Sequence, residues 1–141
     1  MKRTHEIADQ IAVLMPQIAR QILMEFFTSV EITQTQLFVV ITLQEKGCCR
    51  LSELSKDLRV SAPTVTGIID RLEKSGHVQR IPDIEDRRAI NIQLTPRGND
   101  LAKRLRTTVQ NRWRDIIEKL PLSDSENYLK ILHKIKNLFA K

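Results

Sequence analysis

Aromatic residues are scarce in this chain, at 4% of the sequence. A hydrophobic core must therefore be built mainly from Leu, Ile and Val. Only four glycines are present, which argues against an all-β fold crowded with tight turns. The longest uninterrupted apolar run, residues 37–41, is far too short to span a bilayer. We therefore expect a mainly helical protein that does not reside in a membrane.

Side chains that commonly carry chemistry are also few. The two cysteines, Cys48 and Cys49, are adjacent, a spacing that suits neither a disulfide nor a metal site. The three histidines are scattered without metal spacing, and we find no glycine-rich phosphate loop and no nucleophile–base motif. We expect no enzyme activity, no cofactor and no metal. The N-terminal MKRTHEIADQ lacks the apolar stretch of a signal peptide, which favours a cytoplasmic location.

Positive charge, by contrast, is in excess. The net charge is +6, and residues 50–106 hold twelve Lys and Arg against eight Asp and Glu. A hydrophobic fraction of 41% and a length of 141 residues are ordinary for one globular unit. A basic middle segment is compatible with binding to a polyanion such as nucleic acid.

Most of the chain has helical periodicity. Residues 4–28 are apolar at helical spacing, with Pro16 placed to kink or divide that helix. Thr33 and Gln36 form a capping box for a helix that ends near Gly47. Thr95 and Pro96 open a long helix to residue 120. Ser123 and Glu126 form a second capping box for a last helix to residue 139.

The middle third has the pattern of a winged helix-turn-helix. A short helix over residues 52–58 is followed after Arg59 and Val60 by a second helix, for which Ser61 is the N-cap and Gly76 the left-handed stop. A strand at HVQRI, a turn at PDIEDRR and a strand at AINIQLT form the wing. The predicted fold class is therefore mainly α (α+β).

The second helix of a helix-turn-helix lies in the DNA major groove. The apolar stripe of this helix must face the core, so the remaining residues of its first turns face outward. These outward residues are the DNA-binding candidates: Ser61, Pro63, Thr64, Thr66, Gly67 and Arg71. In the wing, Asp86, Arg87 and Arg88 are further DNA-binding candidates, and Arg88 is placed to reach a minor groove. We expect Asp86 to hold the Arg88 guanidinium in a bidentate pair.

The segments PTVTGIIDRLEKSG, DIEDRRA and LTPRG follow one another in this chain. With these segments, the chain resembles the MarR family of bacterial transcription regulators. The motifs match from about Leu51 to Gly98, and the order of the flanking helices extends the resemblance over residues 1–141 as a single unit. The resemblance implies a homodimer on a palindromic double-stranded operator, usually as a repressor that a small molecule or an oxidant releases. It implies a recognition helix over residues 61–75 and a wing arginine at Arg88. Many relatives have an arginine where this chain has Gly67.

A dimer also follows from the residues themselves. Helices at 4–30 and 96–140 carry apolar stripes that a winged part of residues 33–95 is too small to cover, and a twofold pair would bury them. Three questions stay open. Cys48 and Cys49 either pack or sense oxidants, although packing is favoured. Trp113, with Phe26, Phe27 and Phe38, either lines a pocket for a small-molecule effector or belongs to the core. The winged part could instead bind another protein, which salt dependence would reveal.

Overall fold

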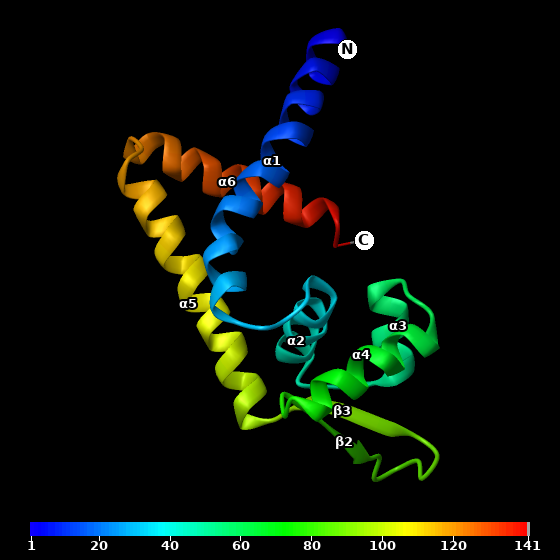
Figure 1. Ribbon diagram of the computed structural model, residues 1–141. Coiled ribbons are helices and arrows are strands. Elements are labelled where there is room, and N and C mark those ends of the chain that lie inside the picture. The colour runs from blue at the N-terminus through cyan, green and yellow to red at the C-terminus, as the bar shows by residue number, and fades with distance from the viewer. Residues whose placement is uncertain (141) are drawn as a thin grey trace. The chain divides into compact units, whose positions relative to one another are not determined.

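The computed structural model of the protein describes residues 1–140 (Figure 1). Its elements in chain order are α1 (Lys2–Ser29), α2 (Gln34–Lys46), β1 (Cys48–Arg50), α3 (Leu51–Leu58), α4 (Ala62–Lys74), β2 (Val78–Pro82), β3 (Ile90–Leu94), α5 (Pro96–Glu118) and α6 (Leu122–Leu138). The fold is mainly helical with one small sheet, as predicted. It separates into a winged unit, residues 26–106, and a helical unit formed by residues 1–25 and the chain from residue 107 onward.

The helices of the winged unit begin and end at the residues that the sequence indicates. The Thr33 side chain accepts the backbone N–H of Gln36 at 3.2 Å, and the Gln36 side chain accepts that of Thr33 at 3.0 Å, which confirms the capping box. Ser61 is the N-cap of α4. Gly47 and Gly76 follow α2 and α4 with φ values of +81° and +82°, which are strained for residues with a side chain.

The sheet has the strand order β1-β3-β2, with both pairs antiparallel. β1 is an addition to the predicted wing, and it pairs Cys49 with Ile92. Three residues are too few to produce a recognisable alternation, so the sequence pattern does not reveal this strand. Ile90, Ile92 and Leu94 alternate along β3, and of these Ile92 and Leu94 are buried, whereas Ile90 is 47% exposed.

The core of the winged unit lies between its helices and the sheet. It is aliphatic apart from one phenylalanine and one cysteine, as the scarcity of aromatic residues predicts. Its most buried side chains are Phe26, Val39, Val40, Leu43, Cys49, Leu54, Val65, Ile69, Leu72, Val78 and Ile92. Each buried aliphatic side chain contributes about 1.5–3 kcal/mol relative to full exposure, so this core holds the recognition helix and the wing in a common frame.

The helical unit departs from prediction at one capping box. α1 is one continuous helix through Pro16, so of the two predicted outcomes the division is excluded. The second capping box is wrong: α6 begins one residue before Ser123, and Pro121 is its N-cap, with no side-chain cap hydrogen bond. The backbone N–H groups of Asp124 and Ser125 donate to the Pro121 carbonyl instead.

Apolar side chains remain uncovered on the helical unit. Large hydrophobic residues of α1 and α6 are 37–73% exposed in the single chain: Ile7, Ile11, Val13, Leu14, Met15, Ile18, Met24, Leu122, Leu129, Ile131, Leu132, Ile135 and Leu138. Within residues 1–140, no single helix is both long and apolar enough to cross a membrane. Only α1 and α2 taken together, bent by 95°, pass on length and composition.

Candidate nucleic-acid interface

The recognition helix α4 is amphipathic in the predicted sense. Its stripe of Val65, Ile68, Ile69 and Leu72 is buried in the winged unit. The predicted DNA-binding residues lie on the other faces of the helix. Ser61, Pro63, Thr64 and Arg71 are exposed, whereas Thr66 and Gly67 are half-buried.

The hydroxyl groups on this face are already engaged at the start of the helix. Ser61 Oγ accepts the backbone N–H of Thr64 at 3.3 Å and lies 2.8 Å from Thr64 Oγ1. Thr66 Oγ1 donates to the Ala62 carbonyl at 2.9 Å. Each hydroxyl oxygen has two lone pairs, so further hydrogen bonds remain possible for all three side chains. Their orientation is therefore set by the helix before any ligand arrives.

Gly67 leaves an opening on the outer surface of α4. A Cβ built at this position would meet no heavy atom within 4 Å. The glycine is consequently not required by packing inside the protein. Its effect is to leave the α4 backbone accessible from outside.

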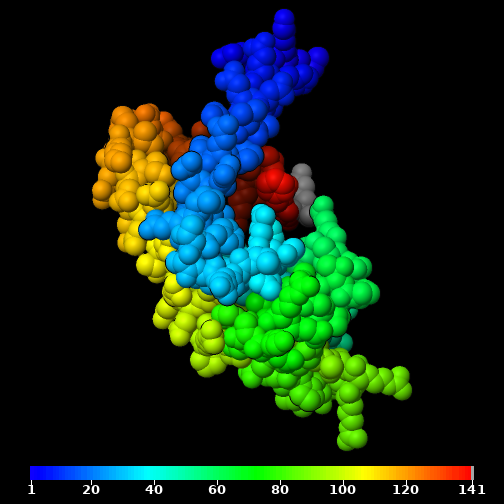
Figure 2. Space-filling model, viewed as in Figure 1, coloured from blue at the N-terminus to red at the C-terminus, as the bar shows by residue number. Residues whose placement is uncertain are grey.

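The turn of the wing is ordered by two carboxylates, and one prediction about it is wrong. The Asp86 carboxylate accepts the backbone N–H of Arg88 at 3.0 Å rather than holding the Arg88 guanidinium. Because the two residues are so close in the turn, the carboxylate reaches the backbone first. Both Arg87 and Arg88 are exposed, and side chains of the turn (yellow-green in Figure 2) extend into solvent.

Asp83 fixes the other end of the turn. Its Oδ1 accepts the backbone N–H of Glu85 at 2.9 Å, and its Oδ2 accepts from Arg50 Nη2 of β1 at 2.9 Å. The Glu85 N–H, followed by the Arg50 guanidinium, lowers the pKa of the Asp83 carboxyl below its usual value. The wing is thus tied to β1 by an ion pair as well as by backbone pairing.

A basic hollow of about 450 Å³ lies between the recognition helix and the wing. Three arginines line it, Arg50 from β1, Arg80 from β2 and Arg88 from the turn, and Thr66 of α4 faces the same space. The remaining lining residues are Leu51, Ser52, Ala89 and Ile90. Sequence reasoning found Thr66 and Arg88 but missed Arg50 and Arg80. No pattern in HVQRI singles out Arg80, and Arg50 depends on the unpredicted β1.

Comparison with known proteins identifies this arrangement. Residues 32–90 match the model of the MarR family. An uncharacterised HTH-type transcriptional regulator, YsmB of Bacillus subtilis, is 31% identical over 127 residues, which cover 90% of this chain and 84% of that protein.

The chain belongs to the MarR family. It is accordingly a DNA-binding transcription regulator and not an enzyme. A MarR family protein from Bacillus stearothermophilus has the same fold, with a TM-score of 0.90 at 22% identity, covering 100% of this chain and 99% of that one. A mutant of MarR from E. coli, solved in complex with operator DNA, gives a TM-score of 0.66 at 24% identity, covering 90% of this chain and 91% of that one.

The two cysteines of this MarR-family chain lie on opposite faces of β1. Cys48 is exposed, whereas Cys49 is 1% exposed in the core. Burial, followed by the nearby Glu53 carboxylate, raises the pKa of the Cys49 thiol. A buried neutral thiol is a poor nucleophile, so these features favour packing over oxidant sensing at Cys49.

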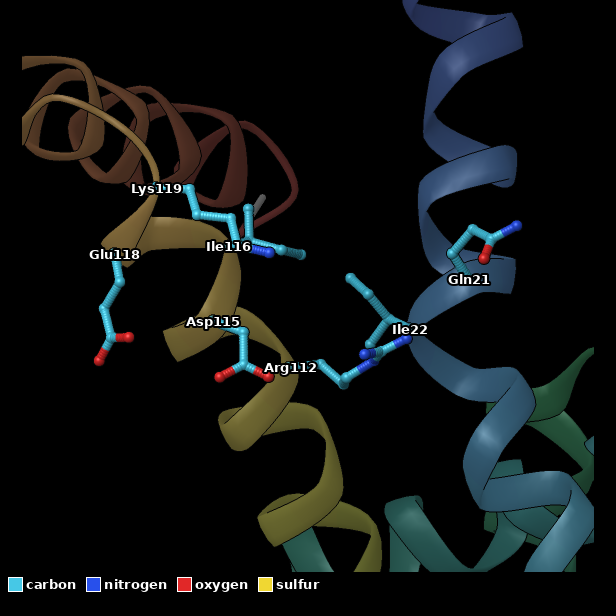
Figure 3. A pocket seen from close by; sticks show the side chains of 7 residues that line it. All are labelled: Gln21, Ile22, Arg112, Asp115, Ile116, Glu118 and Lys119. Carbon is cyan, nitrogen blue, oxygen red and sulfur yellow. The ribbon is translucent and has the colours of Figure 1, made fainter.

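Open hollows lie on the described part of the helical unit. One, of about 400 Å³, lies between α1 and α5 and is lined by Gln21, Ile22, Arg112, Asp115, Ile116, Glu118 and Lys119 (Figure 3). Arg112 reaches across toward Ile22, whereas Glu118 points away from α1. Trp113 and Tyr128, whose ring centroids are 5.9 Å apart, line two apolar hollows of about 380 and 210 Å³.

The aromatic residues that the sequence offers as an effector pocket have different environments. Phe26 is 1% exposed and belongs to the core, where it contacts Phe27 edge to face at 5.8 Å. Phe38 is 47% exposed. Trp113 alone among them lines the apolar hollows of the helical unit. Within residues 1–140, no group of three or more metal-ligating side chains comes together.

Proposed function

We propose that this protein acts as a homodimer that binds a palindromic double-stranded operator, usually to repress transcription, and that a small molecule releases it. The observation that carries the proposal is the basic hollow beside α4, where Arg50, Arg80 and Arg88 converge next to Thr66. At this edge of the recognition helix the exposed Arg88 can approach DNA, whereas carboxylates hold Arg50 and Arg80 in place around it. We expect this regulator to work in the cytoplasm, where it meets the chromosome.

The roles of the individual residues follow from the geometry of α4 and the wing. We assign base-edge and phosphate contacts to the outward face of the helix: Ser61, Pro63, Thr64, Thr66, Gly67 and Arg71. Arg87 and Arg88 reach the adjacent minor groove, where the negative potential of narrow A·T-rich stretches attracts arginine. Asp86 contributes by ordering the backbone at Arg88.

The homodimer is supported by the uncovered faces of α1 and α6. These helices expose many aliphatic side chains in the single chain, and proteins of this family are typically dimeric. Burial of such a surface is favourable by about 25 cal/mol for each Å² removed from water. A twofold pair would bury both copies of the stripe and would present two recognition helices to successive turns of DNA.

Binding of the purified protein to fragments of its own chromosome tests the proposal. We expect affinity to fall steeply with salt, because log K changes by about −0.9 per log unit of salt for each neutralised phosphate. Arg88→Ala should weaken binding by about 1–3 kcal/mol, and Thr64→Ala should also weaken it. Arg114→Ala, which removes an exposed arginine of the helical unit, is the matched control and should bind like the parent.

The outcome also discriminates the alternatives. If Arg88→Ala and Thr64→Ala both bind operator like the parent, the assigned contacts are wrong. A stable monomer in sedimentation, or no binding to any chromosomal fragment at low salt, refutes the proposal as a whole. Tight binding to a protein partner with little response to salt would instead favour a protein-contact role for the wing.

A further inference from the structure

Arg80 joins the wing to the recognition helix through two carboxylates. Its Nη2 donates to Asp70 Oδ1 at 2.5 Å, and its Nη1 donates to Glu73 Oε1 at 2.6 Å. Both carboxylates belong to α4, whereas Arg80 belongs to β2. The Arg80 side chain is only 24% exposed, and these two carboxylates hold its pKa above the usual value. We call the three residues the Arg80 clamp.

Glu73 binds both the side chain and the main chain of Arg80. Its second oxygen, Oε2, accepts the Arg80 backbone N–H at 3.3 Å. A single carboxylate therefore restrains the position of the β2 backbone as well as the direction of the guanidinium. A planar guanidinium held by two acceptors has little freedom to rotate, and charge-assisted bonds of this length are among the stronger ones in proteins.

The clamp lies where the two proposed DNA-contacting parts meet. Asp70 follows Thr66 by one turn of α4, and Arg80 and Thr66 line the same basic hollow as Arg88. Arg80 pairs with Ile92 at the centre of the β2–β3 ladder, and that ladder leads directly to the turn that carries Arg88. The clamp therefore links α4 directly to the β2–β3 ladder, through a contact that sequence reasoning did not identify.

We infer that Arg80 is a positioning residue, which keeps the wing and the recognition helix in the relative placement needed to engage two grooves at once. This inference rests on the proposed function, because it assumes that α4 and Arg88 contact DNA together. With both terminal nitrogens of the guanidinium donating to carboxylates, Arg80 acts through the wing rather than as the main partner of a phosphate.

Removal of the two carboxylates separates positioning from simple electrostatics. The double variant Asp70→Ala, Glu73→Ala deletes two negative charges from the proposed DNA-binding helix and leaves Arg80 in place. Electrostatics alone predicts tighter binding to DNA, because less charge repels the phosphates. The clamp predicts weaker binding, by about tenfold, because the wing loses its anchor. Tighter or unchanged binding overturns the inference.

A cycle with Arg88 adds a second measurement on DNA. If the clamp positions the wing, Arg88→Ala should cost less affinity in an Arg80→Ala background than in the parent, and we expect a coupling of about threefold or more. Equal losses in the two backgrounds contradict the inference. Arg80→Lys, which offers one compact charge instead of a fork, should lie between Arg80→Ala and the parent.

Amide hydrogen exchange of the free protein tests the clamp without DNA. We expect Arg80→Ala to accelerate exchange at the β2–β3 ladder, whereas the matched control Arg104→Ala, an exposed arginine of α5, leaves it unchanged. Unchanged exchange in Arg80→Ala means that the wing is held without the clamp. The exchange measurement does not depend on DNA binding. If the parent binds no DNA, the proposed function is refuted, and the exchange rates at the β2–β3 ladder then decide whether the clamp holds the wing.

Discussion

Gly67→Ala should make the protein more stable and its binding to DNA weaker. Gly67 lies inside α4, where glycine is less favourable than alanine by about 0.8–1 kcal/mol. A Cβ at this position meets no heavy atom within 4 Å, so steric strain does not offset the gain in helix propensity. The substitution should therefore raise the free energy of unfolding by about 1 kcal/mol.

The gain is large enough to measure in the winged unit. For a unit of residues 26–106 that melts cooperatively, about 1 kcal/mol corresponds to a Tm increase of roughly 4–8 °C. Binding should change in the opposite direction, because the added methyl group occupies the space through which the α4 backbone approaches DNA. A misfit of one methyl group in a close-packed contact costs about 1–3 kcal/mol.

Thermal unfolding by circular dichroism and operator binding by fluorescence anisotropy measure the two effects. Gly98→Ala is the matched control, because a Cβ there would overlap the His77 carbonyl, and this variant should lose stability. If Gly67→Ala lowers Tm, the open environment assigned to this position is incorrect. If it binds operator as tightly as the parent, the α4 backbone does not approach DNA at Gly67.

Three further predictions concern stability and reactivity. Burial, followed by the Arg97 charge, lowers the pKa of His77 below 6.5 in the folded state, so the unfolded chain binds this proton at a higher pH than the folded protein does. The free energy of unfolding should therefore fall as the pH decreases below about 6.5. Urea titrations should show that the free energy of unfolding of His77→Asn depends less on pH than that of the parent. Thr33→Ala removes half of the capping box and should cost about 1 kcal/mol in the same titrations, whereas an unchanged midpoint would contradict the role of the cap. In the folded protein a thiol reagent should modify Cys48 rapidly and Cys49 only on unfolding; equal rates would mean that the Cys49 site opens freely.

Sequence reasoning succeeded where structure depends on neighbouring residues. The caps at Thr33 and Ser61 and the stops at Gly47 and Gly76 each involve residues within one helical turn, so their chemistry is visible in the sequence. The buried stripe of α4 follows from its period for the same reason. These local signals were sufficient to order the elements of the winged helix-turn-helix.

The errors arose where two interactions compete or where distant segments meet. Ser123 has the sequence of an N-cap, but Pro121, with φ −55° and ψ 141°, takes that position and its carbonyl accepts the first helical bonds. Asp86 has a choice between the Arg88 guanidinium and the Arg88 backbone, and spacing alone does not decide between them. The meeting of Arg50 and Arg80 in one hollow requires the sheet order, which no local pattern contains.

The strand order has a consequence for molecules crowded side by side on a chromosome. β3 is enclosed between two neighbours, and the outer strands are short: β1 has three residues, and β2 has five and ends in Pro82, which has no N–H to offer. Unpaired strand borders are templates for intermolecular ribbons, and brevity and proline both discourage such growth. The wings of adjacent copies should therefore not pair strand to strand, even at high local concentration.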